Sequence, residues 1–470
     1  MAEACAGWTD NAGNHHDCRF ADEAPVHKFN GKTYCRFHLP MGKAGEGGKT
    51  DWDEERQAAI TDAIIGRIKA ESKAELKNLK KQRSQLDFQG VVVPGEFSLA
   101  NETIPWLDMS YAQFHGDAWF NHAGFHGDAG FKEARFHRIA QFADAQFHEI
   151  AWFYEARFHG EGGFTEAQFY GDAEFAKARF HGRASFYHAQ IHLDAVFSEA
   201  RFHGEAGFNE AQFHGEAEFN EARFHGRAEF NGSADPAQPE ARQFNSTSFR
   251  RAHFEAEANF SNREFRDHTD FSGCEFKEAP KFHGSILHQD TAFGGIECFP
   301  DTTSNGADRA YRTLRQAMEA HRARAEEGMF YTQEQKARRH GMSRFDPAFL
   351  MSLGYGLGSN YGFSIVRPFA YLVVGIFASA LLLLCVGMVF GGPGGVGADL
   401  AAMWNDGLLF SVRQTFLPFD ALRSKDEILA AYTFNPGGTG WLRAWGLVLT
   451  LFEALAALLL VLAIRWRYRR

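Results

Sequence analysis

The chain has 470 residues, 45% of them hydrophobic, and a formal net charge of −10 at pH 7. This length predicts more than one domain, and the negative balance argues against a general nucleic-acid-binding surface. Six cysteines are too few for a disulfide scaffold in a chain of this size.

Residues 1–50 contain no apolar stretch behind basic residues, so we expect no signal peptide and a largely cytoplasmic protein. This segment is predicted to be a loop-rich knot with four metal-ligand side chains: Cys5, Cys18, Cys35 and His38. The two-residue spacing between Cys35 and His38 suits one half of a zinc site, while His15 and His16 are rival ligands. A knot this short and polar needs a metal for stability, so we predict a structural zinc. The alternative is three reduced thiols in an unstructured arm.

Residues 51–87 are predicted to form a helix with one apolar stripe and a face of Lys and Glu residues. Asp51 is the expected N-cap. The stripe consists of Ala58, Ile60, Ala63, Ile64, Ile68 and Leu76. We expect this helix to cover the open end of the stacked structure that follows, because stacked repeats need a cap for solubility.

Residues 88–299 carry a fixed period, in which a Phe recurs in alternating steps of five and six residues. Of the 22 positions from Phe114 to Phe230, 21 are Phe and the exception is Ile191. Nearly every one follows an Ala two residues earlier. A period of this kind indicates a solenoid. Phe at this spacing can be buried throughout only if the chain turns a corner between short extended pieces.

Four of these short extended pieces, one on each side, make a coil of 22 residues. If the coils stack as parallel strands about 4.8 Å apart, residues 88–299 form nine to ten turns. The Ala two residues before each Phe is small because its side chain must also fit inside the coil. The period breaks at Asn231–Gln243, where Pro236 and Pro239 occur, and resumes at Phe244. We interpret the break as a loop extruded from one continuous rod. Two separate rods are the alternative.

Units such as Ala118-Trp119-Phe120 and Ala123-Gly124-Phe125 resemble the pentapeptide-repeat family. The resemblance implies a right-handed quadrilateral β-helix, here with an 11-residue double unit. The sixth residue in alternate steps departs from the family pattern and implies wider corners on alternating sides. The fold class is therefore a β-solenoid with flanking helices and, as the remaining sequence predicts, a C-terminal two-helix transmembrane domain.

Residues 300–367 are predicted to be a charged helical linker and juxtamembrane segment, with a kink at Gly328. Residues 368–470 contain two apolar stretches long enough to span a bilayer, 368–390 and 444–464. Basic residues before the first stretch and after the second place both chain termini in the cytoplasm. We therefore expect a bacterial inner-membrane protein whose loop between the spans lies outside.

The order span, short helix, return segment, span is similar to the two-transmembrane ion-channel family, although the potassium filter sequence is absent. The resemblance implies a pore in a homo-oligomer, by analogy a tetramer. The return segment that stands at the filter is Thr415, Phe416, Leu417, Pro418 and Phe419. Glu453 lies inside the second span, where a carboxylate faces a polar interior or a partner. One hypothesis is a ring of carboxylates around a cation pore. The alternative is a protonated Glu453 bonded to a neighbouring helix.

Histidines recur every 22 residues in two files, which a 22-residue coil would place as two ladders on opposite faces. The first file is His115, His137, His159, His181, His203 and His225, and the second is His126, His148, Tyr170, His192 and His214. Stacked imidazoles should have lowered pKa values. A metal-binding or pH-sensing surface is one interpretation, and solvated corner residues are the other.

No catalytic constellation is evident, so we expect a protein that is not an enzyme. The favoured function is a cytoplasmic rod that binds a protein partner and is coupled to an oligomeric pore in the lipid membrane. One alternative is a passive membrane scaffold. Another is an acidic DNA mimic, because residues 112–230 hold 18 acidic and 10 basic side chains. The membrane anchor fits mimicry poorly.

Overall fold

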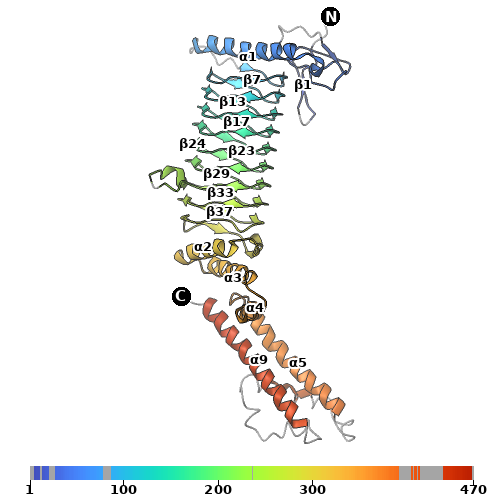
Figure 1. Cartoon of the computed structure of the whole chain (residues 1–470), viewed down its shortest axis with the longest axis vertical. Coiled ribbons are helices and arrows are strands. Elements are labelled where there is room, and N and C mark those ends of the chain that lie inside the picture. Colours follow the sequence, from blue (N-terminus) through green and yellow to red (C-terminus); the bar gives the residue numbers. More distant parts are fainter. Residues whose placement is uncertain are drawn as a thin grey trace. The chain divides into compact units, whose positions relative to one another are not determined.

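The computed structural model describes residues 5–10, 13–18, 20, 27–77, 86–235, 237–390, 404–405, 407–409, 411–412 and 438–467. The chain divides into two compact units, Met1–His321 and Arg322–Arg470. The first unit is built on the solenoid and the second consists of helices (Figure 1).

Four parallel sheets form the four sides of the solenoid, as the sequence predicts, and consist almost entirely of two-residue strands (Figure 1). They run from β5 (Leu86–Asp87) to β39 (Ala292–Phe293), from β6 (Val92–Val93) to β38 (Glu275–Phe276), from β7 (Phe97–Ser98) to β35 (Ala258–Asn259), and from β8 (Thr103–Ile104) to β36 (Glu264–Phe265). These sheets have ten, nine, eight and eight strands. Phe114 pairs with Phe136, and Phe136 with Phe158, so the coil has the expected 22 residues.

The core is a set of stacked Phe rings. Phe175 lies 4.8 Å from Phe153 and 5.0 Å from Phe197, with ring planes within 5° of parallel. Against Phe164 and Phe186, on another side of the coil, the ring of Phe175 is edge-on at 5.1 and 5.2 Å. Both geometries are favourable for aromatic pairs. Each fully buried Phe contributes about 2–3 kcal/mol from apolar burial, which makes this stack the main source of the solenoid's stability.

The corners are of two alternating kinds, which explains the alternating step. In the five-residue steps a non-Gly residue adopts the left-handed conformation, as at Glu155 (φ 56°) and Glu199 (φ 59°). In many of the six-residue steps a Gly lies against the backbone of the preceding coil. A Cβ added to Gly182, for example, would lie only 2.3 Å from the carbonyl oxygen of Gly160. Gly is required there by close backbone approach and not by a positive φ.

The interruption is a loop extruded from one continuous rod, as predicted (Figure 1, green). Across it, β28 (Gln212–Phe213) pairs with β32 (Gln243–Phe244), and η2 (Glu240–Arg242) leads back into the coil. The ring of Phe230 still stacks on Phe260 at 5.1 Å. The alternative of two separate rods is therefore wrong.

Arg263 occupies an inward position that an alanine takes in the regular coils, and it is fully buried. Its guanidinium donates to the carbonyl oxygens of Phe208 and Ala211 at 2.8 Å each, to that of Ala241 at 3.1 Å, and to that of Phe230. Buried carbonyls need hydrogen-bond donors, and Arg263 supplies them at the coil that the loop disturbs. Burial lowers the pKa of Arg263 to about 9.

One end of the solenoid is covered by α1 (Glu54–Lys77), which confirms the predicted cap (Figure 1). Its buried residues include Ile64 and Ile68, and the Thr61 hydroxyl accepts a hydrogen bond from the amide of Gly95 at 3.1 Å. The N-cap is Asp53 and not Asp51, because Asp53 Oδ1 accepts a hydrogen bond from the backbone amide of Arg56 at 2.8 Å. Asp51 instead binds loop amides.

At the other end, the chain passes through η3 (Ile296–Cys298) into α2 (Ala307–Ala320). Tyr311 of α2 is buried, donates to the carbonyl oxygen of Asp301 at 2.6 Å and contacts the last ring, Phe299, edge-on at 6.4 Å. The helix then breaks at Arg322 (φ 60°). The kink expected at Gly328 is absent, since Gly328 is buried within the next helix.

Among the described residues, the long helices of the second unit are α3 (Arg324–His340), α4 (Pro347–Ser359), α5 (Val366–Phe390) and α9 (Gly438–Arg467). Helices α5 and α9 lie side by side and α4 contacts both (Figure 1). Within the described residues, only 448–465 of α9 is long and apolar enough to cross a membrane. The apolar stretch described in α5, Val366–Leu382, is shorter. The two-helix transmembrane domain therefore stays a prediction.

Candidate metal centre

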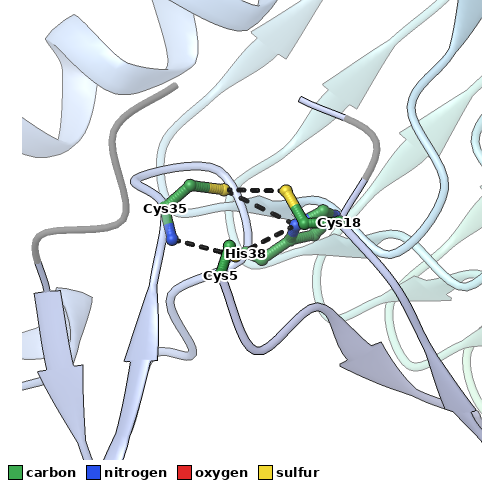
Figure 2. A group of neighbouring side chains, drawn as sticks. All are labelled: Cys5, Cys18, Cys35 and His38. Atoms are coloured by element: carbon green, nitrogen blue, oxygen red, sulfur yellow. Dashed lines mark hydrogen bonds between the residues drawn. The ribbon is translucent and has the colours of Figure 1, made fainter. Parts of the chain in front are cut away.

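Two short hairpins organise the N-terminal knot: β1 (Trp8–Thr9) with β2 (His15–His16), and β3 (His27–Phe29) with β4 (Lys32–Tyr34). The segments between and beyond them bring together the predicted set of Cys5, Cys18, Cys35 and His38 (Figure 2). The four ligand atoms all lie within 4.8 Å of one another. Cys35 and His38 are buried, and Cys5 and Cys18 are half-buried.

Three of the separations in this cluster are compatible with a metal site. Cys18 Sγ lies 3.7 Å from Cys35 Sγ, and His38 Nδ1 lies 3.5 Å from Cys35 Sγ and 3.9 Å from Cys5 Sγ. A disulfide would need about 2.05 Å between sulfurs. A tetrahedron with Zn–S of about 2.3 Å and Zn–N of about 2.0 Å has edges of about 3.5–3.8 Å. The four residues therefore fit a closed, four-coordinate zinc, with the amide of Cys35 donating to Cys5 Sγ at 3.0 Å.

The orientation of His38 is set by its other ring nitrogen. Nε2 lies 3.1 Å from the carbonyl oxygen of Gln89, to which it can only donate, so Nδ1 is the ring nitrogen left to bind a metal. Burial opposes charge on His38, but hydrogen bonds with Cys35 and Cys5 outweigh it and raise its pKa to about 9. Hydrogen bonds from Cys18 and Cys35 lower the pKa of Cys5. Hydrogen bonds with Cys35 and Cys5 raise the pKa of Cys18. The metal-free cluster thus favours the thiolate at Cys5 alone, and a metal ion would have to displace the remaining protons.

The rival ligands lie elsewhere. His16 stacks on Trp8 at 4.0 Å and lies 3.2 Å from Asp10 Oδ2, while His15 is exposed. Neither belongs to the cluster. The structure thus excludes them as ligands in this arrangement, a distinction that sequence spacing left open.

Lys49 attaches the N-terminal knot to the first coil. The sequence does not predict this role, because Lys49 follows a Gly-rich stretch with no recognisable motif. It is fully buried, and its Nζ donates to the carbonyl oxygens of Phe37 at 3.1 Å and Val92 at 2.5 Å. The amide of Val92 also donates to Phe37 O at 2.9 Å. Burial lowers the pKa of Lys49 to about 7. The knot and the first turn of the solenoid therefore form one packed structure.

Comparison with known proteins bears on the solenoid. Four overlapping stretches match the family model described as pentapeptide repeats (9 copies): residues 109–155, 120–168, 142–190 and 186–234. The solenoid is a pentapeptide-repeat domain. Neither the curated proteins nor the solved structures include a significant match to the chain.

The pentapeptide-repeat domain carries the two predicted ladders. In the first, from His115 to His225, successive rings lie 4.2–5.2 Å apart and within 16° of parallel. In the second, Tyr170 stacks between His148 and His192 at 5.1 and 4.9 Å. Neither ladder gathers three potential metal ligands among the described residues. The metal-binding interpretation thus has no support here.

The predicted lowering of pKa is confirmed for seven of these histidines, although its largest cause is burial and the neighbouring charges come second. The strongest case is His115, whose pKa falls to about 4, and the others are His137, His148, His159, His181, His192 and His203. Rings that stack on one another lose part of the water that would stabilise their charge, even where the side chain is exposed, as at His137 and His159.

These histidines should make the domain acid-sensitive. Unfolding restores a pKa of about 6.5, so the unfolded chain binds more protons, and stability falls as pH drops from about 6.5 to about 4. For His115 the full loss is about 3 kcal/mol. The variant His115→Gln should therefore lose less stability than the wild type between about pH 7 and about pH 4, measured by urea unfolding. His283→Gln, outside both ladders, is the control, and equal losses in all three proteins would contradict the prediction.

The pore candidates Thr415, Phe416, Leu417, Pro418 and Phe419 lie outside the described residues. The described residues just before them, between 404 and 412, are helical, and Trp404 stacks on Phe377 of α5 at 6.4 Å. Glu453 is buried where α9 meets α5, and its Oε1 would lie 3.8 Å from a Cβ added to Gly375. Glu453 therefore lies against α5 within one hairpin. The carboxylate ring and the protonated Glu453 bonded to a neighbouring helix both stay predictions.

Proposed function

We propose that this protein is a membrane-anchored binding rod. The pentapeptide-repeat domain is a cytoplasmic surface for a protein partner, the helices α5 and α9 cross the bacterial inner membrane, and the protein is not an enzyme. The observation that carries this proposal is the side-chain distribution on the helix pair, which is the reverse of that in a soluble protein.

Large apolar side chains of α5 and α9 face outward, and small or polar ones face inward. Those more than half exposed include Val374, Phe377, Leu381, Leu451, Leu455, Leu458 and Val461. Those buried include Ser379, Ala380, Glu453, Ala456 and Ala463. Small residues allow membrane helices to approach closely, and a Cβ at Gly375 would lie only 3.2 Å from the Phe452 ring. Lipid is the environment that such an outer surface requires.

The charges at the hairpin ends support a cytoplasmic location for the termini. Arg367 opens α5 and Arg465 is near the end of α9, and both of these helix ends lie beside α4. Basic residues on one side of a span mark the cytoplasmic face.

Alkaline extraction of membranes tests the anchor. The full chain should stay in the membrane pellet, because about 20 apolar residues per span resist extraction, whereas residues 1–321 alone should be soluble. Release of the full chain into the supernatant would show that the outward apolar surface is covered by protein and would overturn the proposal.

For the rod itself, the favoured partner is a protein rather than nucleic acid. Acidic mimicry of DNA is not favoured, because one sheet of the domain carries an uninterrupted column of arginines: Arg135, Arg157, Arg179, Arg201 and Arg223. A uniformly acidic surface would be needed for mimicry, and this column breaks it.

A pore is the second candidate function, and the polar side chains enclosed within the helical unit favour it. Thr450 and Glu453 of α9 and Ser379 of α5 are all buried, although both helices are rich in apolar residues. One hairpin cannot enclose water, so conduction requires a homo-oligomer, by channel analogy a tetramer.

Mass measurement in detergent decides whether a pore is feasible, since a monomer excludes it. If the protein is oligomeric, planar-bilayer recordings should show that Glu453→Gln reduces cation preference, because the variant removes the carboxylate charge at the centre of the span. Leu455→Ala, on the outward face of α9, is the control. Equal current and selectivity in the wild type and Glu453→Gln would remove the carboxylate from the conduction path.

A further inference from the structure

Three cations converge beside α4 in the helical unit. Lys336 and Arg339 belong to α3, and Arg367 opens α5. Arg367 Nη1 donates to the carbonyl oxygen of Gly356 at 3.3 Å, and a Cβ at Gly356 would lie 3.1 Å from Arg339 Nη1. Both guanidinium groups therefore lie against the same residue of α4.

This positive charge has no counter-ion within the described chain. None of the three side chains lies within 4.0 Å of a carboxylate oxygen there, and the nearby Glu334 is bonded to Arg338 at 2.5 Å. Burial lowers the pKa of Lys336, and Arg367 and Arg339 lower it further. Like charges held together in this way are costly unless an anion lies between them.

The surface beside these cations is apolar and exposed. On α4, Leu350 is 60% exposed, Met351 77% and Leu357 58%. On α5, Val366, next to Arg367, is 74% exposed. An anion site bordered by exposed hydrocarbon side chains matches a molecule with an anionic head and an acyl tail, whereas a free phosphate ion would gain nothing from the apolar border.

We propose that Lys336, Arg339 and Arg367 bind the phosphate of an anionic phospholipid headgroup, while the exposed face of α4 lies against its acyl chains. Arg339 and Arg367 would contact the phosphate oxygens, since guanidinium groups suit this geometry, and Lys336 would add charge. This inference rests on the proposed membrane anchor, because it requires α4 to lie at the cytoplasmic surface of the bilayer.

Native mass spectrometry of the full chain in detergent tests the site, with phosphatidylglycerol and phosphatidylcholine as the two probes. The wild type should retain phosphatidylglycerol preferentially. Each cation removed should weaken retention about fivefold, so Arg367→Gln should lose about fivefold and the double variant Arg339→Gln/Arg367→Gln about 25-fold. Arg367→Lys keeps the charge and should keep most of the binding.

The matched control is Arg344→Gln, which removes an exposed charge between α3 and α4 that is not part of the cluster. It should leave retention unchanged. An equal loss in Arg344→Gln, or equal retention of the two lipids, would overturn the inference. Loss of the preference in Arg367→Lys together with a lowered unfolding temperature would also do so, because it would point to a structural role of the guanidinium.

Two further measurements distinguish a lipid site from a free-anion site and from a protein that is not anchored in the membrane. Excess inorganic phosphate should not displace the lipid, and displacement would show a free-anion site instead. Alkaline extraction of the same protein shows whether it is anchored at all. A chain that stays in the membrane pellet but binds both lipids alike refutes only this site, whereas a chain released by alkali refutes the anchor and the site together.

Discussion

The variant Phe175→Asp should unfold the middle of the solenoid. Phe175 is fully buried and stacks on Phe153 and Phe197 in the coils on either side. Removing a buried Phe costs about 3–5 kcal/mol, and an unpaired carboxylate in its place adds several more. Because a domain's net stability is about 5–15 kcal/mol, the coils around residue 175 should lose protection in hydrogen–deuterium exchange.

The matched control is Phe175→Leu, which keeps an apolar side chain in the same position and should cost about 1–2 kcal/mol. In a solenoid each coil contacts only its neighbours, so the loss in Phe175→Asp should be greatest near the substitution and smaller toward the capped ends. Native exchange rates throughout Phe175→Asp would mean that the ring stack does not hold the coils together.

Substituting Cys35 by Ser should abolish metal binding and release the N-terminal knot. Cys35 would supply one sulfur ligand, and it contacts both Cys18 and His38 at distances suited to one zinc ion. Structural zinc contributes about 10–16 kcal/mol in small domains, far more than the knot's own core can supply. Metal analysis should give one zinc per wild-type chain and none in the variant, and residues 5–38 should exchange their amide hydrogens rapidly in the variant.

The control is His15→Ala, an exposed histidine in the same segment that does not contact the cluster. It should retain a full equivalent of zinc. Coils beyond the first should stay protected in Cys35→Ser, because their stability comes from the Phe stack. A wild type purified without metal that shows the same protection of residues 5–38 would refute a structural role for zinc.

The sequence predicted the metal cluster and the start of α1 only in part. Convergence of Cys35 and His38 follows from their spacing, but the choice of His38 over His16 depends on β1 and β2, which place His16 against Trp8. The N-cap of α1 was assigned two residues too early, because Asp51 and Asp53 are equally good caps by residue type.

Other features have no sequence signal. Lys49 and Arg263 resemble ordinary surface residues, yet both are fully buried donors to backbone carbonyls. Their partners lie 12 to 55 residues away and follow no period. Such contacts depend on how a particular loop or interruption closes, and the pattern of residue types does not encode that.

By itself, the sequence determined the four-sided coil. In the regular coils Phe recurs in alternating steps of five and six residues, so each ring's neighbours in the stack are the rings one side and one turn away. Only the tertiary structure decided which histidine completes the metal set, what satisfies the carbonyls beside the extruded loop, and that Glu453 faces α5 within one hairpin. Each of these depends on a single contact between segments whose approach no repeat dictates, and its energy becomes available only once those segments have packed.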